Sequence, residues 1–83
     1  MEKYNLMGIV IENRKEFAPA VQDILTEYGC IIKMRLGLHE GIENSCSNEG
    51  FIILNLVDDD KKIDGFIKKL KNIESVRVKN IKV

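Results

Sequence analysis

The spacing of the apolar residues changes along this chain in an order that few folds allow. Four segments either alternate apolar with polar positions or are almost continuously apolar over a short length. Both patterns are typical of β-strands. Two further segments repeat apolar residues at three- and four-residue steps, which is typical of amphipathic helices. The strand segments are residues 4–12, 30–39, 51–57 and 75–83, and the helix segments are residues 13–29 and 58–70.

The order strand, helix, strand, strand, helix, strand predicts an α+β protein with a ferredoxin-like βαββαβ fold. Right-handed crossovers then give a four-stranded antiparallel sheet with both helices on one face. Segments 4–12 and 51–57 are the least polar, so we expect them to form the two central strands. A chain of 83 residues has room for one core, and we expect a single domain over residues 1–83.

The composition argues against several classes of protein. Thirteen basic and thirteen acidic residues give a formal net charge of zero, which argues against coating nucleic acid or an anionic membrane. No apolar run reaches the roughly 20 residues that a membrane-spanning helix needs, and the first residues lack the pattern of a signal peptide. Two cysteines cannot form a disulfide framework. We therefore expect a cytoplasmic protein that contacts no membrane.

The central strand segments carry apolar residues on both faces. In the first, Leu6 and Val10 alternate with Met7, Ile9 and Ile11, and the third strand segment has the same character. Two helices can cover only one face of a sheet, and monomers seldom leave a large apolar surface exposed. We therefore expect a homo-oligomer, a dimer or a tetramer, although scattered half-exposed aliphatic residues are also normal.

Two details of the outer strands follow from the same patterns. In segment 30–39, every second residue is apolar, and these residues are expected to share one face: Ile32, Met34, Leu36 and Leu38. In segment 75–83, Ile81 is out of phase with the valines before it, which predicts a β-bulge near Asn80.

Sequence motifs for catalysis are missing. The chain has one histidine and lacks the nucleophile-elbow, phosphate-loop and dinucleotide-binding patterns. Two cysteines cannot hold an iron–sulfur cluster within one chain, because such clusters take four ligands. RNA-recognition domains of this fold stack bases on aromatic side chains of the central strands, where this chain offers only Tyr4 and Phe51. We expect neither an enzyme nor direct nucleic-acid binding.

Three residues with ligand chemistry flank the turn between the second and third strand segments. His39 and Glu40 precede this turn, and Cys46 lies within it. Imidazole and thiolate are good ligands for zinc, nickel or copper, so a hairpin that brings them together predicts a metal site completed by a second subunit. A surface histidine beside a loop cysteine is the plainer interpretation, because complete sites show more ligands.

Glycines surround the same hairpin at positions 37, 41 and 50. Glycine allows close backbone approach, which fits either a small-ligand pocket near a subunit contact or turn geometry alone. The sequence does not identify a cofactor. The residues expected to contact a ligand are Gly37, His39, Glu40, Cys46 and Ser47.

Nearly the whole chain resembles the iron-only hydrogenase system regulators. The resemblance rests on residues 8–14, 24–29, 35–40, 46–54 and 76–79. It implies an ACT-like domain, usually free-standing and encoded near hydrogenase maturation genes in anaerobic bacteria. The chain is also similar to the C-terminal domain of nickel-responsive regulators, where a strand histidine pair and a downstream cysteine hold the metal across a tetramer interface. His39 and Cys46 match part of that pattern, whereas Gly37 stands in place of the partner histidine.

These observations lead to one functional hypothesis and two alternatives. The hypothesis is a regulatory module that senses a small ligand or a metal, belongs to an iron-only hydrogenase system, and acts without its own DNA-binding domain. Its ligand would favour one assembly state over another. The first alternative is a ligand-free protein-binding assembly factor. The second is a metal-binding module that uses His39 and Cys46.

Overall fold

The computed structural model of the chain describes residues 4–39 and 49–83. The predicted order of strands and helices is confirmed, with one short 3-10 turn added before the second strand. The elements are β1 (Asn5–Ile11), α1 (Arg14–Glu27), η1 (Gly29–Ile31), β2 (Ile32–His39), β3 (Gly50–Leu56), α2 (Asp60–Lys71) and β4 (Val76–Lys82).

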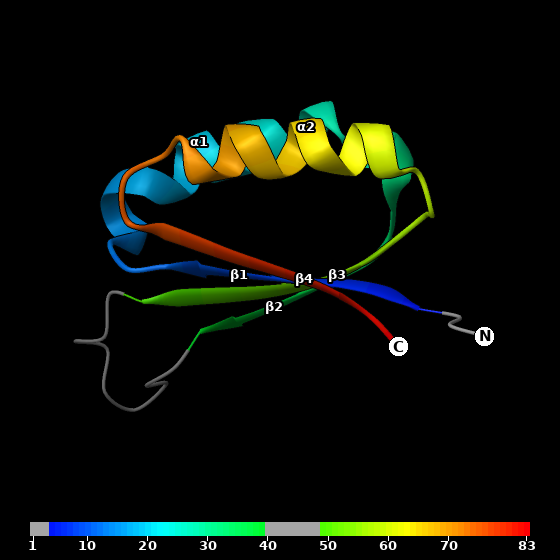
Figure 1. Cartoon of the computed structure of the whole chain (residues 1–83). Helices are drawn as coiled ribbons and strands as arrows, with labels where there is room; N and C mark the ends of the chain where they lie inside the picture. The colour runs from blue at the N-terminus through cyan, green and yellow to red at the C-terminus, as the bar shows by residue number, and fades with distance from the viewer. Residues whose placement is uncertain (1–3, 40–48) are drawn as a thin grey trace.

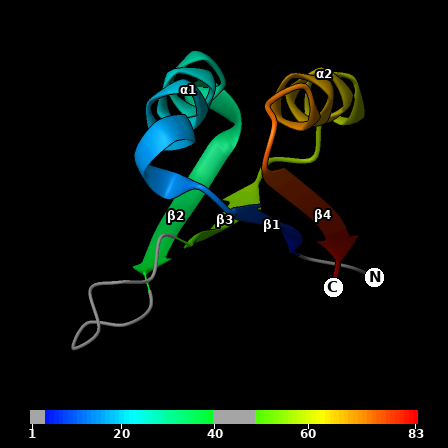
Figure 2. The same cartoon turned by 90° about the vertical axis from the view of Figure 1, so that its left-hand side faces the viewer.

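The four strands form one antiparallel sheet in the order β2-β3-β1-β4, so β1 and β3 are central as predicted. Ile9 pairs with Ile52 of β3 on one side and with Val78 of β4 on the other. Both helices lie on one face of the sheet (Figure 1). Viewed from the side, α1 lies over the β2 half and α2 over the β4 half (Figure 2).

The core fills the space between the sheet and the helices. From α1 it takes Val21 and Leu25, and from α2 it takes Ile63, Phe66 and Leu70, all buried. The strands contribute every second residue, because alternate side chains of a strand point to one face. These strand residues are Met7, Ile9, Ile11, Ile52, Leu54 and Leu56.

An aromatic pair packs between the two helices. The rings of Tyr28, just after α1, and Phe66 in α2 stack with their centroids 4.8 Å apart. Gly65 makes room for this contact, because a Cβ atom at that position would lie 3.1 Å from the Tyr28 hydroxyl. Lys69 and Glu27 add an ion pair between the exposed sides of the helices.

The predicted bulge near Asn80 is wrong. The pairing of β1 with β4 runs without a break from Asn5–Lys82 to Ile11–Val76. Ile81 is out of phase with the earlier valines because it points to the opposite face of the sheet, where it pairs with Leu6.

A bulge lies instead in β2, between Ile32 and Met34. Ile32 pairs with Leu56, whose side chain is buried, whereas Met34 pairs with Asn55. Asn55 directly precedes Leu56 in β3, so its side chain points to the other face of the sheet. The extra residue of a bulge shifts the strand by one position, which turns its later side chains over. The expectation that Ile32 shares a face with Met34 and Leu36 is therefore wrong.

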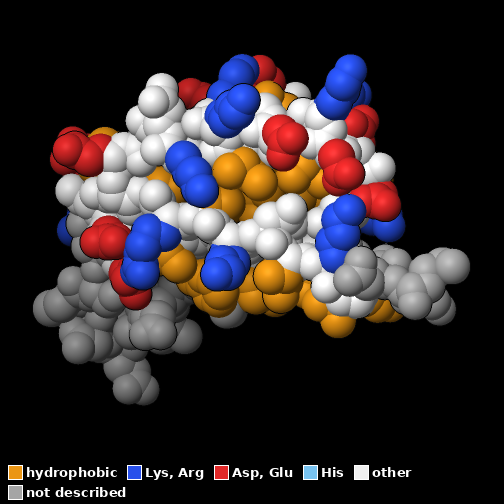
Figure 3. Space-filling model, in the orientation of Figure 1, with side chains coloured by type: hydrophobic (Ala, Val, Ile, Leu, Met, Phe, Trp, Pro, Cys, Tyr) orange, Lys and Arg blue, Asp and Glu red, His pale blue; other side chains and the backbone are white. Residues whose placement is uncertain are grey.

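The sheet face away from the helices is lined by apolar side chains, which confirms that the central strands are apolar on both sides. Met34, Leu36 and Ile81 on the outer strands are each about half exposed, at 51%, 49% and 50%. Hydrophobic side chains gather along this side of the molecule (Figure 3). We call the surface the open sheet face, and its residues are Leu6, Val10, Met34, Leu36, Phe51, Ile53 and Ile81.

Candidate functional site

The residues predicted to bind a ligand lie only partly within the described structure. Gly37 is exposed on β2 and pairs with Ile52, and His39 pairs through its backbone with Gly50. Glu40, Cys46 and Ser47 lie outside the described residues, so the proposed grouping of His39 with Cys46 stays a prediction. Among residues 4–39 and 49–83, no three histidine, cysteine or acidic side chains are grouped as metal ligands.

A hollow of about 320 Å³ lies between α1 and the outer half of the sheet, on the helix-covered face. We call it the arginine hollow after its two charged residues, Arg14 and Arg35. Arg14 opens α1, and Arg35 lies on β2, where it pairs with the buried Leu54. The lining residues are Ile11, Arg14, Ala18, Gln22, Arg35, Gly37, Gly50, Phe51 and Ile52.

Each wall of the arginine hollow follows from local geometry. Arg14, Ala18 and Gln22 are four residues apart in α1, and this spacing places them on one side of the helix. Gly37 leaves space on the second wall, because a Cβ atom there would meet nothing within 4 Å. The predicted ligand residue Gly37 therefore lines a real concavity.

Gly50 sets the position of the Arg14 side chain. A Cβ atom at Gly50 would lie 3.1 Å from the Arg14 Cδ atom, so the aliphatic part of Arg14 packs directly on the β3 backbone. This packing buries the Arg14 Nε atom, which has no hydrogen-bond partner in the described part of the chain. A buried donor without a partner is uncommon in native proteins.

The open sheet face holds a second concavity, of about 520 Å³, which is lined mainly by apolar side chains. Leu6, Val10, Phe51 and Ile53 of the two central strands are among its lining residues. On its β4 side the concavity is lined by Arg77 and Lys79, and a carboxylate oxygen of Glu12 lies 3.0 Å from the Arg77 Nε atom.

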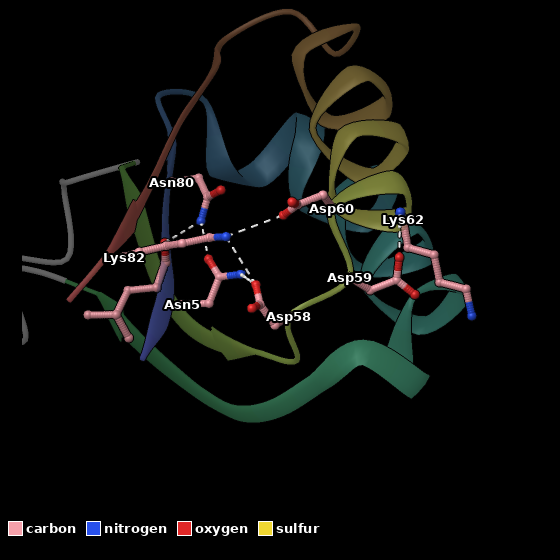
Figure 4. Close-up of polar contacts among 8 residues, drawn as sticks. Asn5, Asp58, Asp59, Asp60, Lys62, Asn80 and Lys82 are labelled. Carbon is pink, nitrogen blue, oxygen red and sulfur yellow. Dashed lines mark hydrogen bonds and ion pairs between the residues drawn. The ribbon is translucent and has the colours of Figure 1, made fainter. Parts of the chain in front are cut away.

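A polar network closes the opposite end of the sheet (Figure 4). Asn5, only 5% exposed, accepts a hydrogen bond of 2.7 Å from Asn80 and donates one of 3.5 Å to Asp58. Lys82 lies 3.1 Å from Asp58 and 3.4 Å from Asp60, and these carboxylates raise the pKa of its ammonium group. These contacts join β1, β4 and the start of α2.

Sequence reasoning missed both the arginine hollow and this network. Arg14 and Arg35 lie on elements that are not hydrogen-bonded to each other, so only the packing of α1 on the sheet brings them to one concavity. The signal for the network was a polar residue, Asn5, at the start of an otherwise apolar strand.

A family model matches residues 3–80, nearly the whole chain, and is described as "TM1266-like: Iron-only hydrogenase system regulator, putative". The chain belongs to this TM1266-like family. The resemblance seen in the sequence is thereby confirmed. No curated protein matches this TM1266-like chain.

Solved structures support the same assignment. Protein TM1266 from Thermotoga maritima is 26% identical, with a TM-score of 0.83 over 100% of this chain and 99% of that one. The ACT domain of GTP pyrophosphokinase from Chlorobium tepidum is 13% identical, with a TM-score of 0.69 over 96% of this chain and 86% of that one. CPII, a nitrogen regulatory PII-like protein from Thiomonas intermedia K12, is 13% identical, with a TM-score of 0.57 over 96% and 87%. The last two establish the fold alone, which is ACT-like as predicted.

Proposed function

We propose that this chain is a regulatory module of an iron-only hydrogenase system, with one domain over residues 1–83, that self-associates and senses a small ligand. Membership of the TM1266-like family supports the regulatory role. The observation that carries the proposal is the open sheet face, which gives the module a surface for a second copy.

The open sheet face extends across the whole sheet. Met34 and Leu36 are its exposed apolar side chains at the β2 edge, and Ile81 is the exposed apolar side chain at the β4 edge. Apolar surface that is contiguous and half exposed is uncommon on monomers and marks interaction sites. A second copy presents the same apolar chemistry, so a symmetric dimer, or a tetramer built from dimers, covers these side chains.

Similar folds support the ligand-sensing role. The structure of CPII holds ADP, AMP and bicarbonate, and the Chlorobium tepidum domain belongs to GTP pyrophosphokinase. We place the ligand of this chain beside the β2–β3 hairpin, near Gly37 and His39, with Glu40, Cys46 and Ser47 as further contacts. A ligand that binds one assembly state more tightly shifts the population toward that state.

In this proposal the module has no enzymatic activity and acts in the cytoplasm through another protein. Among the described residues, no helix is long and apolar enough to span a membrane. The ligand-free assembly factor remains the second candidate, because the open sheet face serves a protein partner equally well.

Light scattering over a concentration series tests self-association. We expect a dimer or tetramer for the wild type and a shift toward monomer for Leu36→Asp, which places a charge in the open sheet face. Ala20→Asp adds the same charge at an exposed position of α1 and serves as the matched control. A monomeric wild type at high concentration would remove the proposal.

A second experiment separates the sensing hypothesis from its alternatives. Thermal unfolding is followed with panels of amino acids and nucleotides, because a ligand present at about 100 times its Kd adds roughly 2.7 kcal/mol of stability. Metal analysis of the purified protein, with His39→Ala and Cys46→Ala as controls, tests the metal module. Bound metal that both variants lose would support that alternative, and a silent panel would favour the assembly factor.

A further inference from the structure

The arginine hollow carries two guanidinium groups that lack an anionic partner. Within the described residues, neither Arg14 nor Arg35 forms an ion pair, whereas Arg77 binds both Glu12 and Glu49. None of the described residues that line the hollow is an aspartate or a glutamate. Two positive charges facing one concavity without compensation attract an anion, and the attraction is strengthened where the concavity excludes water.

The Arg14 side chain is positioned before any ligand arrives. Its aliphatic part packs on Gly50, and its Nε atom is buried without a hydrogen-bond acceptor. A buried charged donor without a partner is unfavourable, because it has lost its hydrogen bonds to water. A ligand that supplies an acceptor would remove this penalty, and this would favour binding. Arginine suits this task because its planar group donates two parallel hydrogen bonds to a carboxylate or phosphate.

The remaining walls fit the uncharged part of a small molecule. Ile11, Ala18 and Ile52 are apolar, and Gln22 offers both a donor and an acceptor. The volume of about 320 Å³ lies at the lower end of the range for ligand clefts, roughly 300–1,000 Å³. The absence of a side chain at Gly37 keeps the space above β2 open.

We propose that the arginine hollow binds a small organic anion through Arg14 and Arg35, with a carboxylate or phosphate group between the two guanidinium groups. The regulatory consequence of this binding rests on the function proposed above, in which a ligand beside the β2–β3 hairpin controls assembly. The binding itself depends only on the hollow.

Titration by two-dimensional NMR tests the site with named probes. Glycerol 3-phosphate represents phosphates and succinate represents carboxylates, each compared with sodium chloride at equal ionic strength. We expect saturable shifts of the Gly37 and Gly50 amide signals and of the Arg14 Nε–H signal with one of the two probes. Shifts that sodium chloride reproduces, or no saturable shift with either probe, would overturn the proposal.

Two variants with a matched control separate binding from folding. Gly37→Val changes no charge, suits a β-strand, and fills the open space, so it should fold and abolish binding. Arg35→Gln removes one exposed charge and should weaken binding by about tenfold or more. Lys71→Gln removes a charge on α2, away from the hollow, and should bind like the wild type. Unchanged binding in Gly37→Val would place the anion elsewhere and refute the site.

Light scattering on the same samples distinguishes this inference from the proposed function. Saturable binding by a protein that stays monomeric would support the anion site and contradict self-association. Self-association without saturable binding by either probe would support the assembly surface and refute the anion site.

Discussion

Asn80 donates a hydrogen bond of 2.7 Å from its Nδ2 atom to the Oδ1 atom of Asn5, across the β1–β4 pair. The same Nδ2 atom lies 2.8 Å from the carbonyl oxygen of Leu6. Asn5 is the polar residue buried in this part of the sheet, and its amide also reaches Asp58 (Figure 4). Asn80 and Asn5 therefore link β4 and β1 to Asp58, in the segment that leads into α2.

Replacing Asn80 by alanine should destabilise the fold. The substitution leaves the buried Asn5 oxygen without its donor, which costs about 1–3 kcal/mol. Urea denaturation measures the change as a lower midpoint. Lys79→Ala is the control, because it also truncates the side chain at Cβ, at the neighbouring, exposed position of β4. Equal midpoints for the two variants would show that the amide network adds no stability.

The ion pairs of Lys82 predict a loss of stability in strong alkali. Hydrogen bonds to Asp58 and Asp60 raise the pKa of the Lys82 ammonium group above its ordinary value of 10.5. The folded state therefore holds this proton more tightly than the unfolded state does. The resulting stabilisation is complete below pH 10.5 and is lost as the pH rises through the higher pKa of the folded state.

Urea unfolding at about pH 9 and about pH 11.5 tests this dependence. The wild type should lose more stability between the two pH values than Lys82→Met, which has no ammonium group to deprotonate. The difference should be small, because the Lys82 side chain is exposed to solvent. Lys68→Met, at an exposed position of α2, should behave like the wild type. A larger alkaline loss in Lys82→Met than in the wild type would reverse the expected sign.

The sequence predicted the elements and the topology because each strand and helix carries its own periodicity. Ile63, Phe66 and Leu70 repeat at helical spacing and all prove to be buried. The alternation of Met7, Ile9 and Ile11 with Leu6 and Val10 separates the two faces of β1 correctly. Local patterns of this kind survive folding, because the period of an element fixes which residues share a face.

The positions of strand irregularities could not be predicted in the same way. When both faces of a sheet are apolar, a break in the alternation of apolar and polar residues has two explanations. The strand has a β-bulge, or the apolar residue points to the second face. Ile81 is the second case, and the pattern alone does not separate it from a bulge. The real bulge between Ile32 and Met34 is hidden because both residues are apolar while they face opposite sides.

The arginine hollow was beyond sequence reasoning for a different reason. Gly37 and Gly50 indicated a region of close backbone approach, but a glycine in the sequence does not identify the side chain that packs against it. Arg14 comes from α1, and its contact with Gly50 depends on how that helix packs on the sheet. Contacts of this kind are tertiary, so no local pattern records them.

The contact between Gly65 and Tyr28 predicts a coupled pair of substitutions. Alanine usually stabilises a helix by about 1 kcal/mol relative to glycine. At Gly65 the new Cβ atom would lie 3.1 Å from the Tyr28 hydroxyl and push the ring away from Phe66. Gly65→Ala should therefore stabilise the Tyr28→Phe variant more than it stabilises the wild type, as measured by a double-mutant cycle of thermal unfolding. A gain of equal size in both backgrounds would contradict this steric coupling.

Asn55 offers a site where a substitution should stabilise the protein. It faces the open side of β3 opposite Leu6 and Met34, and its Oδ1 atom is buried without a hydrogen-bond partner among the described residues. Asn55→Val removes this unpaired oxygen and adds a β-branched side chain, so the free energy of unfolding should rise by about 1 kcal/mol.

A second variant and a series of protein concentrations distinguish removal of the unpaired oxygen from the addition of apolar surface. Asn55→Ala removes the oxygen without adding apolar surface, and it should leave stability close to that of the wild type. Asn55→Val should also shift the light-scattering series toward the oligomer at lower concentration, because it extends the open sheet face. Destabilisation by both variants would mean that the Asn55 oxygen gains a partner when the open sheet face is covered.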